Sequence, residues 1–258
     1  LLCMCVLTAC SSDDGDGESN NKDGVYVING HKFVDLGLPS GLLWAECNIG
    51  ASEPEEVGYK YKWGDVEEYT VTGYKFYDGN TNTFTKYNKK DAKITLEPED
   101  DAATVLWGKN CHIPTKKEFE ELIKYCKWKF ADQLGDATVT GPNGNHIYLP
   151  CTSKRDGNIL DENNQGCYYW TGMLSSNNSN KASYLSITTD DTKNVSTHID
   201  LENRYMGFAM RPVYGDYQAG INLQVSEANA ITNTGARIFV LYSGDVENIS
   251  KLGIRYAT

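Results

Sequence analysis

The sequence predicts an α+β domain in which two helices are combined with short antiparallel strands. Two segments carry helix signals, residues 96–106 and residues 114–126. Short apolar runs separated by turn residues occupy the chain before and after these segments, and such runs are typical of strands. Helices that are grouped in one part of the chain, with strands on both sides, indicate an α+β rather than an alternating α/β organisation.

The composition excludes several classes of protein. The 258 residues are 40% hydrophobic and 23% charged, which is typical of a globular chain rather than a disordered one. The formal net charge is −11, and an acidic surface repels phosphate backbones, so we do not expect nucleic acid as a partner. A net four of these charges belong to residues 11–23, where five acids face only Lys22, so the charge argument is weaker for the folded part. No apolar run reaches the roughly 20 residues that span a bilayer.

The first residues resemble the end of a bacterial lipoprotein signal peptide. An apolar run ends at Leu7-Thr8-Ala9-Cys10, which resembles the lipobox that precedes a lipidated Cys. We therefore expect residues 1–9 to be a signal-peptide remnant, Cys10 to carry lipid, and residues 10–24 to include an acidic tether. The lipid would anchor the chain without spanning the membrane, and it is the only membrane contact expected. The alternative is that the apolar run forms a first strand or helix.

The cysteine count is odd once Cys3, Cys5 and Cys10 are assigned to this amino-terminal segment. The remaining cysteines are Cys47, Cys111, Cys126, Cys151 and Cys167. In an oxidising compartment at least one of them must lack a disulfide partner within the chain. The sequence leaves open whether the others are buried thiols or form one or two disulfides. No C-x-x-C pair occurs and the four His are scattered, so we expect neither a metal nor a cofactor.

The strands before the helices are bounded by clear turn signals. Residues 25–28 and 31–36 flank Asn29-Gly30, which is a strong signal for a two-residue hairpin. Residues 42–45 form a short apolar run suited to a buried strand. Residues 52–91 are polar, rich in Tyr and interrupted by Gly, and this composition predicts long loops with little regular structure.

Each predicted helix has a start signal. Pro98 and the acids around it fit the first turn of a helix over residues 96–106, where exposed N–H groups favour negative charge. Thr115 and Glu118 form a capping box that begins the second helix, which we expect to end near residue 126. One face of this helix carries apolar residues at core spacing: Phe119, Leu122, Ile123 and Cys126.

The second half of the domain is predicted to consist of strands. A hairpin around residues 141–145 is followed by three further apolar or aromatic runs. The runs are residues 168–171, 182–187 and 207–213.

Four segments, in this order along the chain, resemble motifs of one group of Bacteroidetes surface lipoproteins. They are Phe33–Ala45, Cys111–Phe119, Tyr168–Gly172 and Gly207–Val213. Two positions depart from the group's pattern, because His112 stands where Arg is usual and Phe119 where Trp is usual. On these motifs, residues 25–214 resemble the FISUMP family, the Fibrobacter succinogenes major paralogous domain.

This resemblance implies a C-type-lectin-like fold and a place on the cell surface. The acidic stretch after Cys10 is similar to the signal that sends lipoproteins of gut Bacteroidetes to the outer leaflet, which implies a lipid-anchored, surface-exposed protein of the outer membrane. The implied fold hosts sugar binding, protein binding and oxidase chemistry, so it does not decide the function. The motifs of calcium-dependent lectins and the reactive Cys pair of the oxidases are not found. Asp156–Asn158 with Asp161–Asn163 could supply oxygen ligands, but such a stretch is more often a solvated loop.

Residues 215–258 resemble the opening strands of a fibronectin-type or immunoglobulin-like repeat. A complete β-sandwich of this kind needs about 100 residues and seven strands. We therefore expect an incomplete β-sandwich after residue 214, or, alternatively, strands that pack onto the preceding domain.

The sequence favours a binding or adhesion module whose partner is a glycan or a protein on another cell or host surface. The expected contact residues are aromatic, amide and basic side chains of the second half: Tyr168, Tyr169, Asn177, Asn178, Asn203, Arg204 and Tyr205. Trp170 is expected to be buried, and Arg211 to serve a structural ion pair. A glycan-processing enzyme is one alternative, but adjacent acids such as Asp100 and Asp101 are explained by a helix start, and no catalytic residue is proposed. A structural spacer in a surface assembly is the other alternative.

Overall fold

The computed structural model describes residues 24–130, 136–161, 166–189 and 195–216, and four short strands after them. The predicted signal-peptide remnant, the lipidation residue Cys10 and the tether as far as residue 23 lie outside the described residues. Glu162 and Asn163 of the possible oxygen-ligand loop lie outside them as well.

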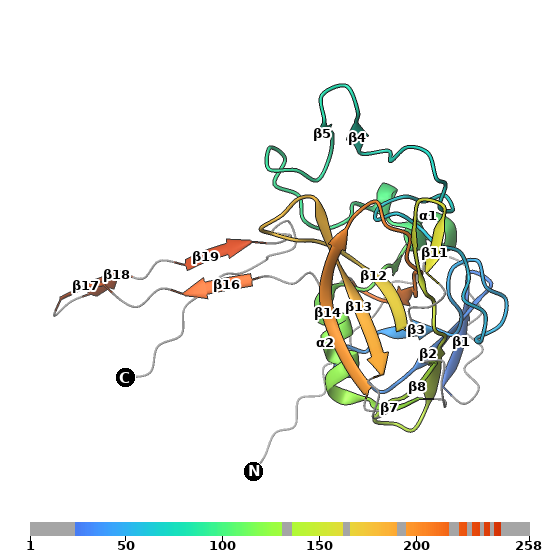
Figure 1. The fold of residues 1–258 in the computed structure, drawn as a ribbon. Coiled ribbons are helices and arrows are strands. Elements are labelled where there is room, and N and C mark those ends of the chain that lie inside the picture. The colour runs from blue at the N-terminus through green and yellow to red at the C-terminus, as the bar shows by residue number, and fades with distance from the viewer. Residues whose placement is uncertain are drawn as a thin grey trace, which may run out of the picture.

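A five-stranded antiparallel sheet joins the beginning, the middle and the end of residues 25–214 (Figure 1). Its strands, in spatial order, are β1 (Val25–Ile28), β2 (His31–Asp35), β3 (Leu43–Ala45), β15 (Val213–Tyr214) and β6 (Cys111–His112). Val213 of β15 is paired with Trp44 on one side and with His112 on the other. The last strand of the region is thus inserted between strands that precede it by about a hundred residues or more in the sequence.

The hairpin predicted at Asn29-Gly30 is confirmed. Strands β1 and β2 are paired from Ile28↔His31 outward, so the turn consists of two residues. Asn29 has φ 51° and Gly30 has φ 81°, and positive φ at both positions is the geometry of a type I′ turn. Asn and Gly adopt this geometry at low cost, which is why the dipeptide fixes the register locally.

Two three-stranded antiparallel sheets and two small hairpins make up most of the remaining structure. The longest strands lie side by side as β12 (Gly166–Leu174), β13 (Lys181–Thr189) and β14 (Val195–Asn203). The second sheet consists of β7 (Lys127–Phe130), β8 (Ala137–Thr140) and β9 (His146–Leu149), in which β8 and β9 form the predicted hairpin. The small hairpins are β4 (Tyr77–Asp78) with β5 (Thr83–Phe84), and β10 (Lys154–Asp156) with β11 (Ile159–Asp161). Strands β4 and β5 are the only named strands between residues 52 and 91, so the predicted long loops are confirmed.

The first predicted helix is divided into two short elements. Residues Pro98–Asp100 form a 3₁₀ turn, and helix α1 begins after it and spans Ala102–Trp107. The side chain of Asp101 accepts hydrogen bonds from the N–H groups of Ala103 and Thr104, so Asp101 is the N-cap and not a residue of the first turn. Its second carboxylate oxygen accepts from the N–H of Ile113 at 2.9 Å, which ties the cap to strand β6.

The second predicted helix is confirmed with both of its boundaries. Helix α2 spans Lys116–Tyr125, the capping box of Thr115 and Glu118 is present, and Cys126 is the C-cap. Glu118 also lies 3.1 Å from the ring nitrogen Nε2 of His112, so its carboxylate contacts strand β6 as well as capping the helix. The helix packs against the sheet of β12, β13 and β14.

The α+β class, expected as a C-type-lectin-like arrangement of two helices and short strands followed by a partial β-sandwich, is wrong. The protein is broadly β-rich, with several antiparallel sheets. Helix α1 has six residues and helix α2 has ten, whereas β12, β13 and β14 have nine each. The sequence signals for helix starts were correct at α2 and close at α1. A signal for a helix start does not indicate how long the helix that follows will be.

The core consists of two buried clusters with tryptophans in both. Trp170 lies 4.3 Å from Phe208, ring centre to ring centre, in the cluster that also contains Trp63. Trp44 lies 5.3 Å from Phe119 of α2 in the other cluster. The indole N–H of Trp170 donates to the carbonyl of Tyr61 at 2.8 Å, so burial leaves no unpaired donor there. The expectation that Trp170 is buried is confirmed.

Four strands follow residue 216 as two separate antiparallel pairs. They are β16 (Asn222–Val225) with β19 (Val240–Ser243), and β17 (Asn229–Thr232) with β18 (Gly235–Arg237). Both pairs are drawn to one side of the main body in Figure 1. Across the part of the chain that the structure describes, no helix has the length and apolar character needed to cross a membrane.

Candidate functional site

A groove opens between the long loop of residues 62–90 and the end of strand β14. Its volume is about 1110 Å³, and the lining also includes residues 156–157 and 179–180. Five aromatic side chains line it: Tyr69, Tyr74, Tyr77, Phe84 and Tyr205. We call this cavity the aromatic groove.

One wall of the aromatic groove is the β4–β5 hairpin, which projects from the body of the molecule (Figure 1). Tyr77 is paired with Phe84 across the hairpin, and their ring centres lie 5.7 Å apart. Asp78 closes the turn, because its carboxylate accepts from the N–H of Asn80 and from the hydroxyl of Thr81, both at 2.9 Å. The ring of Tyr77 remains 43% exposed although its position is fixed. A ring of this kind is available to a ligand at little entropic cost.

Arg204 packs against two of the side chains that line the groove, Tyr74 and Phe84. Its side chain is fully buried, and its guanidinium lies 4.4 Å from the centre of the Phe84 ring and 5.1 Å from that of Trp63. Three further rings lie within 6 Å of the guanidinium: Tyr74, Phe76 and Tyr87. Cation–π attraction is stronger where the cation is desolvated, as it is here.

The guanidinium is also hydrogen-bonded to three separate segments of the chain. Nε donates to the hydroxyl of Tyr74 at 2.7 Å. The terminal nitrogens donate to the carbonyls of Tyr87 at 2.9 Å, Ser179 at 3.2 Å and Lys86 at 3.3 Å. Arg204 therefore fastens the long loop to the turn after β12 and to the end of β14.

Exposed polar and aromatic groups from other segments also line the groove. Tyr205 is 44% exposed, and its hydroxyl lies 3.4 Å from the amide nitrogen of Asn203. Asn180 is exposed in the turn between β12 and β13. These amides can both donate and accept hydrogen bonds. The groove thus presents two exposed tyrosine rings with amide groups beside one of them.

The charges that line the groove are mostly positive. Lys89 and Lys90 are exposed on its rim. Lys62 is buried and donates to the carbonyls of Thr72 and Gly73, and burial lowers its pKa. Asp156 is the single carboxylate among the described lining residues.

The structure does not bring the residues predicted for ligand contact together as one site. Asn203 and Tyr205 line the aromatic groove. Tyr168 is 5% exposed and Tyr169 is fully buried, because both belong to a strand with core on each face. Arg204, between Asn203 and Tyr205, points inward and is structural.

Tyr77 and Phe84 were not predicted as site residues. Residues 52–91 are rich in Tyr, but this composition predicts loops and does not indicate which rings are exposed. The turn formed by Asp78-Gly79-Asn80 between two aromatic residues is the local pattern that could have indicated a projecting aromatic hairpin.

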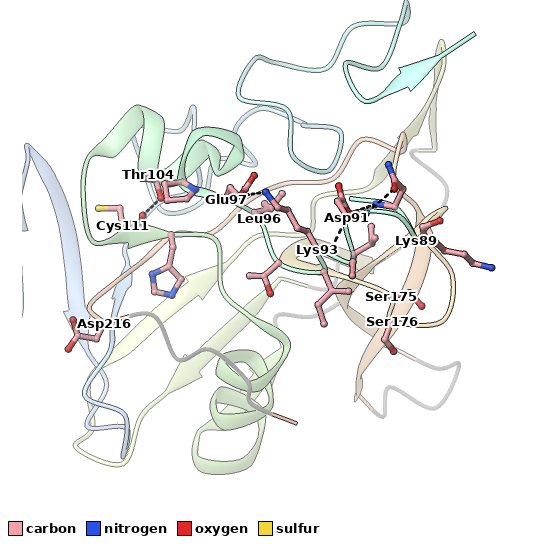
Figure 2. A pocket seen from close by; sticks show the side chains of 18 of the residues that line it. Lys89, Asp91, Lys93, Leu96, Glu97, Thr104, Cys111, Ser175, Ser176 and Asp216 are labelled. Atoms are coloured by element: carbon pink, nitrogen blue, oxygen red, sulfur yellow. Dashed lines mark hydrogen bonds and ion pairs between the residues drawn. The ribbon is translucent and has the colours of Figure 1, made fainter. Parts of the chain in front are cut away.

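Asn177 and Asn178 are exposed but lie outside the aromatic groove. Asn177 lines a second cavity of about 1160 Å³, shown in Figure 2, between residues 88–98, the stretch around Cys111 and the turn after β12. Two of the charged groups in this cavity, Lys93 and Glu97, form an ion pair with each other. Asp216 also lines this cavity.

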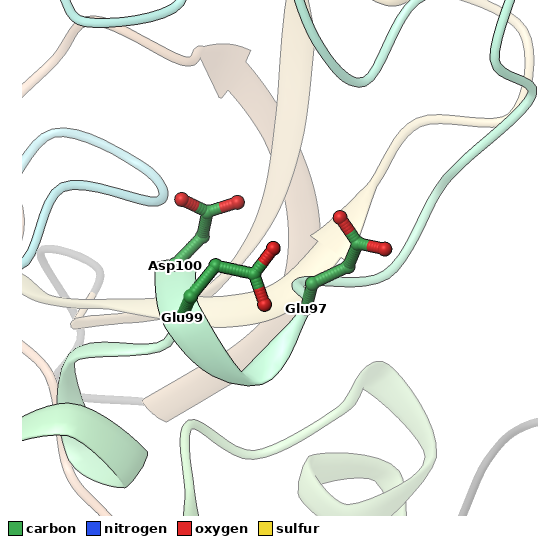
Figure 3. A group of neighbouring side chains, drawn as sticks. All are labelled: Glu97, Glu99 and Asp100. Carbon is green, nitrogen blue, oxygen red and sulfur yellow. The ribbon is translucent and has the colours of Figure 1, made fainter.

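Three carboxylates gather at the 3₁₀ turn before α1, as Figure 3 shows: Glu97, Glu99 and Asp100. Their oxygens lie within 4.8 Å of one another, but Lys86 forms ion pairs with all three. Lys75 adds a second ion pair to Asp100 at 2.7 Å. Burial acts to raise the pKa of Asp100, but the hydrogen bonds from Lys75, Lys86 and Tyr87 outweigh it and the pKa is lowered. Lysines therefore balance the charge of this cluster. Of the two adjacent acids that the helix start was expected to explain, Asp101 is the N-cap of α1, whereas Asp100 is held by Lys75 and Lys86.

The chain matches no protein-family model, no curated protein and no solved structure. The resemblance to the FISUMP family therefore stays a prediction.

Proposed function

We propose that this chain is a glycan-binding module and that the aromatic groove is its binding site. The observation that carries the proposal is the pair of exposed residues Tyr77 and Tyr205, which line the same groove. Sugar rings present C–H faces that stack on aromatic side chains, and their hydroxyls are hydrogen-bonded by amides. Asn203 and Asn180 supply such amides beside Tyr205.

The support beneath the groove favours recognition over a passive role. The fully buried side chain of Arg204 holds three loop segments by hydrogen bonds. A binding site gains affinity when its side chains are already fixed before the ligand arrives. A spacer has no need for exposed rings on such a support.

Hydrolysis of a glycosidic bond is less well supported. Most glycosidases use two carboxylates that flank the bond, about 5–10 Å apart. Asp156 is the one carboxylate among the described residues that line the groove. The acids near residue 100 are engaged by lysines.

Display on the cell surface is part of the same proposal. The lipobox ending at Cys10, the acidic tether and the resemblance of residues 25–214 to FISUMP surface lipoproteins support it. On this proposal the lipid at Cys10 anchors the chain to the outer membrane. The module then meets glycans of another cell or of a host surface, with no nucleic acid as partner.

A glycan array probed with the full chain tests this function. We expect binding to a subset of glycans, and loss of that binding in the double variant Tyr77→Ala, Tyr205→Ala. Tyr125→Ala is the matched control, because Tyr125 is 43% exposed but lies at the end of α2, outside the groove. Shortened glycan products would support the enzyme alternative. Absence of both binding and cleavage would support the spacer.

A further inference from the structure

Cys151 and Cys167 lie in two segments that are fastened to each other. Cys151 follows strand β9, and its Sγ lies 2.8 Å from the carbonyl oxygen of Gly166, the residue before Cys167. The hydroxyl of Thr152 accepts from the N–H of Tyr168 at 2.9 Å and donates to the carbonyl of Tyr168 at 3.0 Å. These contacts align the two cysteines, and a hydrogen bond joins their thiols directly.

The two thiols differ in access and in acidity. Cys151 is half-buried, whereas Cys167 is fully buried in the core. The hydrogen bond from Cys167 lowers the pKa of Cys151 to about 7, and the same bond together with burial raises the pKa of Cys167. Cys151 is therefore the more acidic thiol of the pair, and it is the one that an outside reagent can reach.

A buried cation lies beside this pair. The ammonium group of Lys60 donates to the carbonyl of Thr152, the residue after Cys151. Burial lowers the pKa of Lys60 to about 8, and the charge of Cys151 acts in the opposite direction. Lys60 is thus still largely protonated at neutral pH and close enough to interact with the thiolate of Cys151.

No cysteine acts on the pKa of the other three described cysteines. Burial raises the pKa of Cys47, and it raises the pKa of Cys111 and of Cys126 to about 11. No disulfide joins any of the cysteines in the described part of the chain. The pair of Cys151 and Cys167 is therefore set apart by contact as well as by reactivity.

We propose that Cys151 and Cys167 form a disulfide by thiol–disulfide exchange with a disulfide-bonded donor. The thiolate of Cys151 attacks one sulfur of the donor, forms a mixed disulfide and releases the other sulfur as a thiolate. Cys167 then gives its proton to the departing group, attacks the sulfur of Cys151 and displaces the second donor thiol with the electron pair of the broken bond. The donor is reduced to two thiols while the two cysteines are oxidised, so five cysteines become one disulfide and three thiols.

Peptide mapping of the full chain tests the proposal with oxidised glutathione as donor. The chain is incubated with it at pH 7, blocked with an alkylating reagent and digested with trypsin without reduction. Lys154 and Arg155 separate the two cysteines, so the disulfide should join the peptides of residues 130–154 and 156–181. A brief alkylation of the reduced chain at pH 7 should modify Cys151 at least about tenfold faster than Cys126.

Two variants separate the roles of the cysteines. Cys167→Ser should leave Cys151 as a stable mixed disulfide with glutathione, because no second thiol resolves it. Cys151→Ser should leave Cys167 unmodified. Because this variant keeps the fully buried Cys167, it still tests the proposal if Cys167→Ser fails to fold. Cys126→Ser is the control and should give the joined peptides in the same yield as the unchanged chain.

The proposal is overturned if the joined peptides are not found under conditions that oxidise a reference dithiol. It is overturned equally if Cys151 or Cys167 is joined to Cys47, Cys111 or Cys126 instead. Neither result depends on whether the aromatic groove binds a glycan.

Discussion

The guanidinium of Arg204 lies 4.4 Å from the centre of the Phe84 ring, below the wall of the aromatic groove. Phe84 belongs to a hairpin of two-residue strands, which has little stability of its own. Arg204 follows directly after β14, the edge of the longest sheet. This contact therefore ties the projecting hairpin to the sheet. It also helps to fix the position of the exposed Tyr77, which is paired with Phe84 across the hairpin.

Replacement of Arg204 should destabilise the protein and impair the groove together. Arg204→Lys loses the planar fork that reaches Tyr74, Tyr87 and Ser179 at once, and we expect a cost of about 2 kcal/mol in the free energy of unfolding. Denaturant unfolding measures the cost. An unfolding free energy equal to that of the unchanged chain would contradict the structural role of Arg204.

Arg211 should be at least as sensitive, because it is fully buried and forms no ion pair within the part of the chain that the structure describes. Its guanidinium donates to Asn48 and to the carbonyls of Ala45, Glu46 and Tyr148. Hydrogen bonds to three backbone carbonyls and to the side chain of Asn48 thus take the place of the ion pair expected from the sequence. We expect Arg211→Met to cost about 3 kcal/mol in unfolding free energy, because several buried carbonyls lose their donors. A loss below 1 kcal/mol would show that water or neighbouring groups replace the guanidinium.

The sequence was informative wherever the cause of a structure is local. Asn29-Gly30 determines its own turn, and Thr115 with Glu118 caps its own helix. The groove depends instead on Arg204, which meets Tyr74 across 130 positions of the chain, and no local pattern encodes that contact. Tyr168 and Tyr169 were predicted as contacts because they are aromatic, but the layers on both faces of β12 bury them.

Asp101 should contribute more to the free energy of unfolding than an ordinary helix cap does. It caps α1 through Ala103 and Thr104 and also accepts from the N–H of Ile113, so Asp101→Ala leaves three N–H groups without this partner. We expect a loss of about 2 kcal/mol in thermal or denaturant unfolding. Glu99→Ala is the control, since Glu99 is exposed and should change stability by less than about 0.5 kcal/mol. Equal losses in the two variants would refute the special role of Asp101.

Asp65 should make stability depend on mildly acidic pH. Burial raises its pKa from 3.8 to about 6, against the attraction of Lys62, Lys75 and Arg204, and one of its oxygens has no hydrogen-bond partner. Folding thus favours the protonated form, so the folded state holds a proton that the unfolded state releases between pH 4 and pH 6. The contribution of Asp65 to stability therefore falls as pH rises through this window.

The variant Asp65→Asn removes this titration. Above pH 6 it should be more stable than the unchanged chain by about 1 kcal/mol, a value reduced for the partial solvent access of the carboxylate. At pH 4 the advantage should largely disappear. Unfolding free energies measured for both chains from pH 4 to pH 7 check this, and a difference that does not vary with pH would contradict the assignment to Asp65.

The most direct test of the glycan-binding proposal is the affinity of single tyrosine variants for the strongest array ligand, measured by titration calorimetry. Loss of one stacking ring should weaken binding by about tenfold, or about 1.4 kcal/mol, in Tyr77→Ala and in Tyr205→Ala. Tyr125→Ala should bind as the unchanged chain does. Equal affinity in all four proteins, or the same loss in Tyr125→Ala, would contradict the assignment of binding to the aromatic groove.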